Sequence, residues 1–247
     1  MIRIAFVNSR IEARQHIPIN LLILAACVED IAEAKVFDPE YDDMTLYDIL
    51  DYGPDIVAYS SFTQNYHRTR QIHRIIKANL KDWATYIIGG IHATVLPEQT
   101  YEEMKVDCVF QGEGEQAIRD VVLGWDWSKI AGAYYGNKLR RRPSLIQDLD
   151  SVPMPAYHLF PDFEKYLIPP GTIRGIWEKR GTVAVISSRG CPYHCVFCGS
   201  HAMFGRQVRQ RSVGNIIKEI DLLVNNYGAR SFWFADDTRA DPKVQSS

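Results

Sequence analysis

Several features are scarce or missing in this 247-residue sequence, and each absence argues against a class of protein. Basic residues have no surplus, because 28 Lys and Arg stand against 30 Asp and Glu, for a formal net charge of −2. Binding to nucleic-acid phosphates normally requires a basic face. Apolar runs long enough to cross a bilayer are also missing. We therefore expect neither a nucleic-acid partner nor a membrane span.

A glycine-rich phosphate loop is missing as well. A dinucleotide-binding fold carries G-x-G-x-x-G directly after its first strand. Here the apolar residues 2–7 are followed by Asn8-Ser9-Arg10. The sequence therefore argues against an enzyme that binds a nicotinamide dinucleotide. No signal peptide precedes that apolar run. We therefore expect the protein in the reducing cytoplasm, where structural disulfides are rare.

The first half of the chain alternates between strand and helix patterns. Short apolar runs predict strands at residues 2–7, 34–37, 55–60, 85–88 and 107–110. Helical spacing of apolar residues predicts intervening helices, which begin near Pro18, run through 72–76 and 101–104, and end with 113–123. This alternation predicts an α/β domain over residues 1–147, built on a Rossmann-like, doubly wound parallel sheet with helices on both faces.

Ligands bind such sheets beyond the carboxyl ends of the strands. At these ends the sequence places glycines, which permit close backbone approach, and hydroxyls, which hydrogen-bond polar ligands. The candidate contacts are Ser60, Ser61 and Thr63 after the third strand, Gly89, Gly90 and His92 after the fourth, and Gly112, Glu113 and Gly114 after the fifth. His92 fits the end of a turn equally well. Glu113 and Glu115 also suit a first helical turn, where the helix dipole favours carboxylates.

A different pattern follows the predicted sheet. Residues 148–180 contain the proline-bearing stretch DLDSVPMPAY, which predicts a stiff linker. A β-branched run at 182–187, an amphipathic helix over 213–227 and an apolar run at 231–235 then predict a strand, a helix and a second strand. We expect residues 181–247 to begin a partial (β/α) barrel, a fold that keeps its chemistry at the carboxyl ends of its strands.

Three of the five cysteines stand within eight residues, directly after the predicted barrel strand. Cys191, Cys195 and Cys198 have the spacing C-x3-C-x2-C. Three thiolates can hold three irons of a cubane [4Fe-4S] cluster and leave the fourth iron open to bind a substrate. The alternative is a structural zinc site completed by His194 or His201.

This cysteine loop after a first barrel strand resembles the signature of radical S-adenosylmethionine (SAM) enzymes. The resemblance implies a reduced [4Fe-4S] cluster that binds SAM at its open iron, and reductive cleavage of SAM to a 5′-deoxyadenosyl radical with electrons from an external one-electron reductant. It also implies that Phe197 lies near the adenine and that Asp236 and Asp237 lie near the methionine moiety. An acidic pair at a strand end is also compatible with a plain helix cap.

The predicted sheet domain resembles the cobalamin-binding domain that precedes the barrel in one class of radical SAM enzymes. The similarity lies in the helix at Pro18, SSFT at 60–63, IGGIHAT at 88–94, GEGE at 112–115 and the DLDSVPMPAY linker. This class implies cobalamin as a further cofactor, and methyl transfer or a ring rearrangement on a small-molecule substrate that the sequence does not identify. The string Asp-x-His-x-x-Gly does not occur, so the lower face of a bound corrinoid should lack a histidine ligand.

The chain ends at Ser247, about where a second barrel helix would begin. A complete barrel needs eight strand-helix units of roughly 30 residues each. We therefore expect the front portion of a longer enzyme, and this portion alone need not be active. The alternative is a non-catalytic corrinoid-binding module that carries a vestigial cluster loop.

Overall fold

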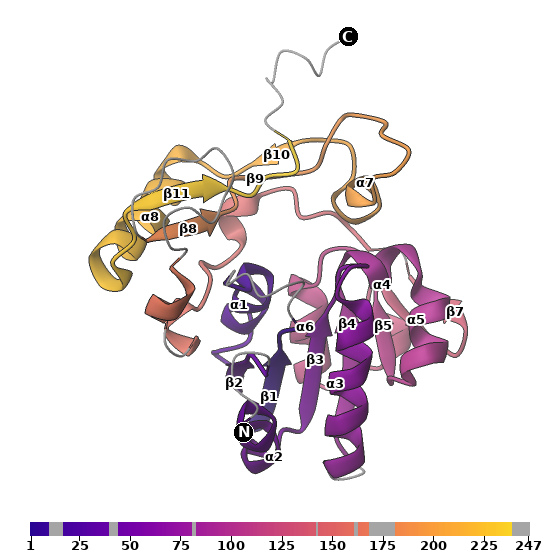
Figure 1. Ribbon diagram of the computed structural model, residues 1–247. Helices are drawn as coiled ribbons and strands as arrows, with labels where there is room; N and C mark the ends of the chain where they lie inside the picture. The colour runs from indigo at the N-terminus through magenta and orange to yellow at the C-terminus, as the bar shows by residue number, and fades with distance from the viewer. Residues whose placement is uncertain are drawn as a thin grey trace.

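A computed structural model describes residues 1–9, 17–39, 44–80, 83–141, 143–160, 163–167 and 181–238 of the chain. Within them, seven strands form one sheet in the order β2-β1-β3-β4-β5-β6-β7 (Figure 1). The first five are parallel: β1 (Ile2–Val7), β2 (Ala32–Phe37), β3 (Ile56–Ser60), β4 (Thr85–Gly89) and β5 (Cys108–Phe110). The strand order reverses between β1 and β3, and ligands of doubly wound sheets bind beyond the strand ends at such a point.

Helices cover both faces of the sheet, because consecutive residues of a strand point to opposite sides. In β1, Ile4 and Phe6 belong to one buried core, whereas Ala5 and Val7 belong to another. The first core is covered by α1 (Ile19–Ala26) and α6 (Glu115–Val122). The second is covered by α2 (Met44–Tyr52), α3 (Tyr66–Asn79) and α5 (Pro97–Met104). The predicted doubly wound α/β sheet is confirmed.

An antiparallel hairpin extends the sheet beyond β5. After a short 3₁₀ helix, η1 (Trp127–Lys129), it is built from β6 (Ala133–Tyr135) and β7 (Lys138–Leu139). Gly136 and Asn137 connect the two strands with φ angles of 54° and 58°. A two-residue type I′ turn requires positive φ at both positions, which glycine and asparagine accept most readily.

A smaller unit stands above the carboxyl ends of the parallel strands (Figure 1). Its strands β8 (Thr182–Val185) and β11 (Ser231–Phe234) pair in parallel, and α8 (Val213–Tyr227) precedes the second of them. The side chain of Ser212 caps α8 by accepting a hydrogen bond from the backbone of Asn215, and Gly228 ends the helix in the left-handed conformation. This strand-helix-strand unit has the order that the sequence predicts for the start of a barrel.

The segment between the two units packs against both. Its described residues contain three 3₁₀ helices: η2 (Leu149–Ser151), η3 (Tyr157–Leu159) and η4 (Phe163–Tyr166). The backbone N–H of Ala156 donates to the carbonyl of Leu22 in α1 at 3.0 Å, and the hydroxyl of Tyr157 donates to Glu219 in α8 at 2.5 Å. Residues 161–162 and 168–180 of the predicted linker, and residues 239–247 of the predicted partial barrel, lie outside the described residues.

Several short elements do not follow from the sequence pattern. Besides α2, these are α4 (Ile91–Val95), β9 (Ser188–Arg189), α7 (Ser200–Phe204) and β10 (Arg209–Gln210). All but α2 lie near the carboxyl edge of the sheet, where the two units meet (Figure 1). Among the described helices, none combines the length and the apolar character needed to cross a membrane.

Candidate cofactor-binding site

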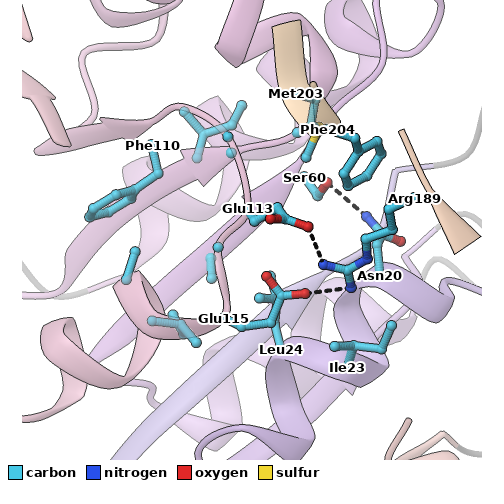
Figure 2. A pocket seen from close by; sticks show the side chains of 18 of the residues that line it. Asn20, Ile23, Leu24, Ser60, Phe110, Glu113, Glu115, Arg189, Met203 and Phe204 are labelled. Carbon is cyan, nitrogen blue, oxygen red and sulfur yellow. Dashed lines mark hydrogen bonds and ion pairs between the residues drawn. The ribbon is translucent and has the colours of Figure 1, made fainter. Parts of the chain in front are cut away.

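A cavity of about 140 Å³ lies between the carboxyl edge of the sheet and the smaller unit (Figure 2). Its floor is formed by the ends of β3, β4 and β5, and one wall by Asn20, Ile23 and Leu24 of α1. The opposite side is closed by residues of the smaller unit, namely Ile186, Ser188, Arg189, Met203, Phe204, Ala235 and Asp237. The lining is mainly apolar with a few polar groups, which is the usual make-up of cofactor sites.

Six of the nine predicted strand-end contacts line this cavity. They are Ser60, Gly89, Gly90, Gly112, Glu113 and Gly114. The hydroxyl of Ser60 accepts a hydrogen bond from the side-chain amide of Asn20 at 2.7 Å, which ties α1 to the end of β3. Glycine is required at position 90, because φ is +94° and a Cβ would lie 2.6 Å from the carbonyl oxygen of Ser61. The sheet edge is therefore kept bare of side chains beside the cavity.

The other three predicted contacts are not among the residues that line the cavity. His92 is buried in α4, stacks on the ring of Tyr66 with centroids 3.8 Å apart, and pairs through Nδ1 with the Thr63 hydroxyl at 3.1 Å. Burial lowers the pKa of His92, so its ring is neutral at pH 7. Ser61 is fully buried. Its backbone N–H donates a hydrogen bond to the carbonyl of Gly89, and its carbonyl accepts one from the backbone N–H of His92. These residues brace the two strand ends against α3 and α4.

Residues 190–208, which we call the Cys loop, are closed at their base by strand pairing. β9 and β10 pair antiparallel, with Arg209 opposite Arg189. Gly190 has φ +95°, and a Cβ there would lie 2.3 Å from the carbonyl oxygen of Gln207. Glycine is therefore needed at the point where the chain leaves β9, one residue before Cys191.

The Cys loop also contacts the sheet domain through α7. A Cβ at Gly199, just before α7, would lie 3.2 to 3.3 Å from Val95 and Ile91 of α4, so the two helices approach closely. Met203 and Phe204 of α7 reach the cavity (Figure 2). The segment that carries the cysteines therefore also supplies part of the cavity wall.

Buried ion pairs join the base of the Cys loop to the sheet domain. The carboxylates of Glu113 and Glu115 accept hydrogen bonds from Arg189 at 2.8 and 2.6 Å (Figure 2). Glu113 also accepts one from Arg209 at 2.9 Å. The backbone N–H of Ile146 also donates a hydrogen bond to Glu113, at 2.8 Å. We call Glu113, Glu115, Arg189 and Arg209 the interdomain clamp. The sequence suggested that the two glutamates contact a ligand or interact with the dipole of the helix that follows. The arginines that pair with them lie 74 to 96 residues away in the chain.

The predicted acidic pair at the end of β11 holds the chain that leads into the Cys loop. Asp236 accepts hydrogen bonds from the backbone of Ser187 at 2.7 Å and Ser188 at 3.0 Å. Asp237 accepts one from the backbone of Gly190 at 3.1 Å, and it lines the cavity. Both carboxylates therefore position the strand end that precedes Cys191.

The three cysteines lie on the outer part of the Cys loop and form no disulfide. Cys195 is exposed, whereas Cys191 and Cys198 are half-buried. The backbone N–H of Cys198 donates to the carbonyl of Cys195 at 3.1 Å, which forms a turn between them, and Phe197 is 89% exposed. Within the described part of the chain, no three Cys, His, Asp or Glu side chains are gathered at metal-binding distances. Three free thiols on one short loop suit a cluster with one open iron or, together with a histidine, a zinc ion.

Comparison with known proteins gives a consistent pattern. Residues 13–122 match the family described as the B12 binding domain. The chain is 34% identical to an uncharacterized methyltransferase of Pyrococcus horikoshii over 90% of its own length and 49% of the relative's. It is 30% identical to the anaerobic magnesium-protoporphyrin IX monomethyl ester cyclase of Rubrivivax gelatinosus, over 88% of this chain and 38% of the relative. The chain thus spans half or less of the length of these relatives.

One solved structure matches the fold over nearly the whole chain. It is the radical S-adenosylmethionine methyltransferase TsrM from Kitasatospora setae with cobalamin and a [4Fe-4S] cluster bound. The TM-score is 0.70 at 19% sequence identity, and the match covers 95% of this chain and 47% of that one. At this identity the likeness supports the order and packing of the two units, that is, the fold alone.

Proposed function

We propose that the protein binds cobalamin in the cavity and takes part in radical SAM chemistry. The match of residues 13–122 to the B12-binding domain family supports the first part of this proposal. The observation that carries the proposal is the shared cavity. Its floor comes from the sheet domain, and its opposite wall comes from the Cys loop, through Met203 and Phe204. A corrinoid held by the first unit would therefore face the loop that is proposed to carry the cluster.

The residues around the cavity suit a large planar ligand with polar groups at its rim. Gly89, Gly90 and Gly112 leave the strand ends without bulky side chains, so backbone can approach the ligand closely. Ser60 and Asn20 offer hydrogen bonds at the rim. Apolar side chains of α1, Ile23 and Leu24, exclude water from one wall. His92 pairs through Nδ1 with Thr63 and stacks on Tyr66, and it is not among the residues that line the cavity.

We assign Cys191, Cys195 and Cys198 as the ligands of a [4Fe-4S] cluster. When bound, such a cluster supplies an open iron that binds SAM and the electron that cleaves it. Asp236 and Asp237 fix the backbone that enters the Cys loop, so their role toward SAM would be to shape its site. Phe197 is exposed beside Cys198, and we propose that it covers the adenine of SAM. The electron comes from an external one-electron reductant in the cytoplasm.

The proposed units are a cobalamin domain at 1–147, a linker at 148–180 and the first part of a radical SAM barrel at 181–247. The reaction proposed for the whole enzyme is methyl transfer or ring rearrangement on a small molecule. The relatives named as methyltransferases support the first of these, and the relatives named as cyclases support the second.

The cluster assignment is tested by anaerobic reconstitution with iron and sulfide. The Cys195→Ala variant should lose most of its bound iron, and Cys108→Ala is the matched control because Cys108 is fully buried in β5, away from the loop. Metal analysis counts iron, sulfide and zinc, and paramagnetic resonance of the reduced protein should change when SAM is added. Stoichiometric zinc without sulfide, or full iron content in Cys195→Ala, would contradict the assignment.

The cobalamin site is tested by filling the cavity. Leu24→Trp adds bulk at the wall of α1, and we expect cobalamin binding, followed by its absorption spectrum, to weaken about tenfold or more. Overpacking of this kind costs about 1 to 3 kcal/mol of stability, so melting is measured in parallel. Leu123→Trp, at a site that is 54% exposed outside the cavity, is the control. Equal cobalamin affinity in both variants would place the corrinoid elsewhere.

A further inference from the structure

The interdomain clamp is buried and electrically balanced. The side chains of Glu113 and Arg209 are 1% and 2% exposed, and those of Arg189 and Glu115 are 9% and 11% exposed. Two carboxylates thus balance two guanidiniums. When one partner of a buried ion pair is removed, the charge that remains is left without compensation, which is strongly destabilising. Loss of Glu113 would leave two arginines short of a carboxylate, and the simplest relief is to open the contact to water.

The clamp grips the Cys loop at both of its ends. Arg189 ends β9, two residues before Cys191, and Arg209 begins β10, directly after the loop. Arg209 also donates to the carbonyl of Phe204 at 2.9 Å, and the guanidinium of Arg189 lies 5.6 Å from the centre of the Phe204 ring. Both arginines therefore hold α7 as well as the base of the loop.

The clamp is anchored where the sheet domain meets the cavity. Glu113 and Glu115 follow β5, and both line the cavity together with Arg189 (Figure 2). The backbone of Ile146, just before the linker, donates to Glu113 at 2.8 Å, and its carbonyl accepts from Arg209. One carboxylate of the sheet domain thus contacts the residues that enter the linker and both ends of the Cys loop.

We propose that Glu113 is a positioning residue that locks the Cys loop onto the cavity edge through Arg189 and Arg209, so that the two cofactor sites face each other at a fixed separation. This inference rests on the proposed function for its purpose, but the locking itself is a property of the chain without cofactors. Glu115 strengthens the lock through its single contact with Arg189.

Hydrogen exchange of the cofactor-free protein tests the lock directly. In Glu113→Gln, peptides from the base of the Cys loop, residues 186–192 and 205–211, should exchange about tenfold faster or more, because their amides become accessible when the contact opens. Peptides from β1, β3 and β4 should exchange at the wild-type rate. Asp30→Asn is the matched control, since it removes a carboxylate that pairs with Arg119 at 2.6 Å on the surface of the sheet domain.

Exchange in the loop base that stays at the wild-type rate in Glu113→Gln would overturn the proposal, and so would equal acceleration in Asp30→Asn. If Glu113→Gln does not fold, as judged by circular dichroism, Glu115→Gln takes its place, with a smaller acceleration expected that is confined to the same peptides. No acceleration there would equally overturn the proposal.

A second readout uses the loaded protein. With cobalamin in its Co(II) state and a reduced cluster, pulsed paramagnetic resonance gives the separation of the two spins. We expect one narrow distance in the wild type and in Asp30→Asn, and a broadened distribution in those Glu113→Gln molecules that hold both cofactors. Failure of the wild type to bind cobalamin or iron would contradict the proposed function, whereas the exchange result would still decide the lock.

Discussion

At the scale of single residues, the candidate site depends on positions where a side chain cannot be added. Gly90 combines a positive φ with close contact to Ser61, whose backbone amide and carbonyl would lie 2.7 and 2.6 Å from a new Cβ. The two strand ends β3 and β4 are therefore in direct backbone contact beside the cavity. This contact brings Ser60 and Gly89, which end these strands, to the same edge of the cavity.

Gly90→Ala should consequently destabilise the protein by more than the strain of its φ angle alone. Strain at such a conformation costs about 1 to 3 kcal/mol, and displacement of the Ser61 backbone adds to it. Gly124→Ala is the matched control, because Gly124 has φ +74° with open space around it. Urea unfolding measures both variants. If Gly90→Ala and Gly124→Ala lost the same amount of stability, the close approach of the Ser61 backbone to Gly90 would contribute nothing to the effect.

Some parts of this site could be predicted from the residues in the sequence, and others could not, for physical reasons. The glycines and hydroxyls at strand ends were predictable, since parallel strands expose their carboxyl ends at one edge. The partners of Glu113 were not, because Arg189 and Arg209 are 76 and 96 residues away and nothing local marks an ion pair across two units. His92 was ambiguous in sequence, and the ring of Tyr66 that buries it comes from another helix.

At the scale of elements, long periodic segments were the predictable ones. The helix over 213–227 matches the predicted bounds, because an amphipathic stripe, a serine cap and a C-terminal glycine all agree. The short elements α4, α7, β9 and β10 contain too few residues for their own sequences to specify them. They form because of contacts between the two units. The pairing of β9 with β10 is what turns the predicted cysteine loop into a closed one.

The packing of α3 against α5 contains a buried histidine that makes stability depend on pH. His73 of α3 pairs with the carbonyl of Met104 at 2.9 Å and with the hydroxyl of Tyr59 at 3.3 Å. Burial, helped by the nearby Lys77, lowers the pKa of His73 from 6.5 to about 4. Above pH 6.5 the ring is neutral in both states. As the pH falls below 6.5, the unfolded chain takes up a proton that the folded chain excludes, so stability decreases down to about pH 4.

Between pH 7.5 and 5, His73 should therefore cost about 2 kcal/mol of unfolding free energy, given 1.36 kcal/mol for each unit of pKa difference. Urea unfolding of the wild type and of His73→Gln at both pH values isolates this contribution, because other groups titrate in both proteins. His67→Gln, at an exposed site on the same helix, should keep the wild-type pH dependence. If the unfolding free energy of His73→Gln changed with pH as much as that of the wild type, His73 would not be the source of this pH dependence.

At the scale of the whole molecule, the two units are joined by buried polar contacts in addition to apolar packing. Glu219 of α8 is fully buried and accepts hydrogen bonds from Tyr157 in the linker and from Arg211 beside β10. Arg211 also donates to the carbonyl of Ile186 at 2.7 Å. Together with the interdomain clamp, these contacts fix the smaller unit on the sheet at two places.

Tyr157→Phe tests whether this second contact stabilises the joined molecule. The variant keeps the ring, which packs against Phe163 and Tyr227, but it removes the hydroxyl that donates to Oε1 of the buried Glu219 carboxylate. A buried acceptor without its donor costs about 1 to 3 kcal/mol, and more when it is charged. The midpoint of thermal unfolding should therefore fall. Tyr47→Phe, on a ring that is 65% exposed, is the matched control.

The regions in which Tyr157→Phe loses protection from hydrogen exchange should also show how the stability of one unit depends on the other. Because Tyr157 sits between the sheet domain and α8, its substitution should accelerate hydrogen exchange in α8 and β8 before it affects β1, β3 and β4. Cobalamin binding to Tyr157→Phe should weaken only as far as the Cys loop is displaced from the cavity wall. Binding of the proposed cluster should persist, because its proposed ligands all belong to the loop. Uniform acceleration across the whole sheet would instead indicate that the two units unfold as one, and that the linker contact contributes to global stability without setting their arrangement.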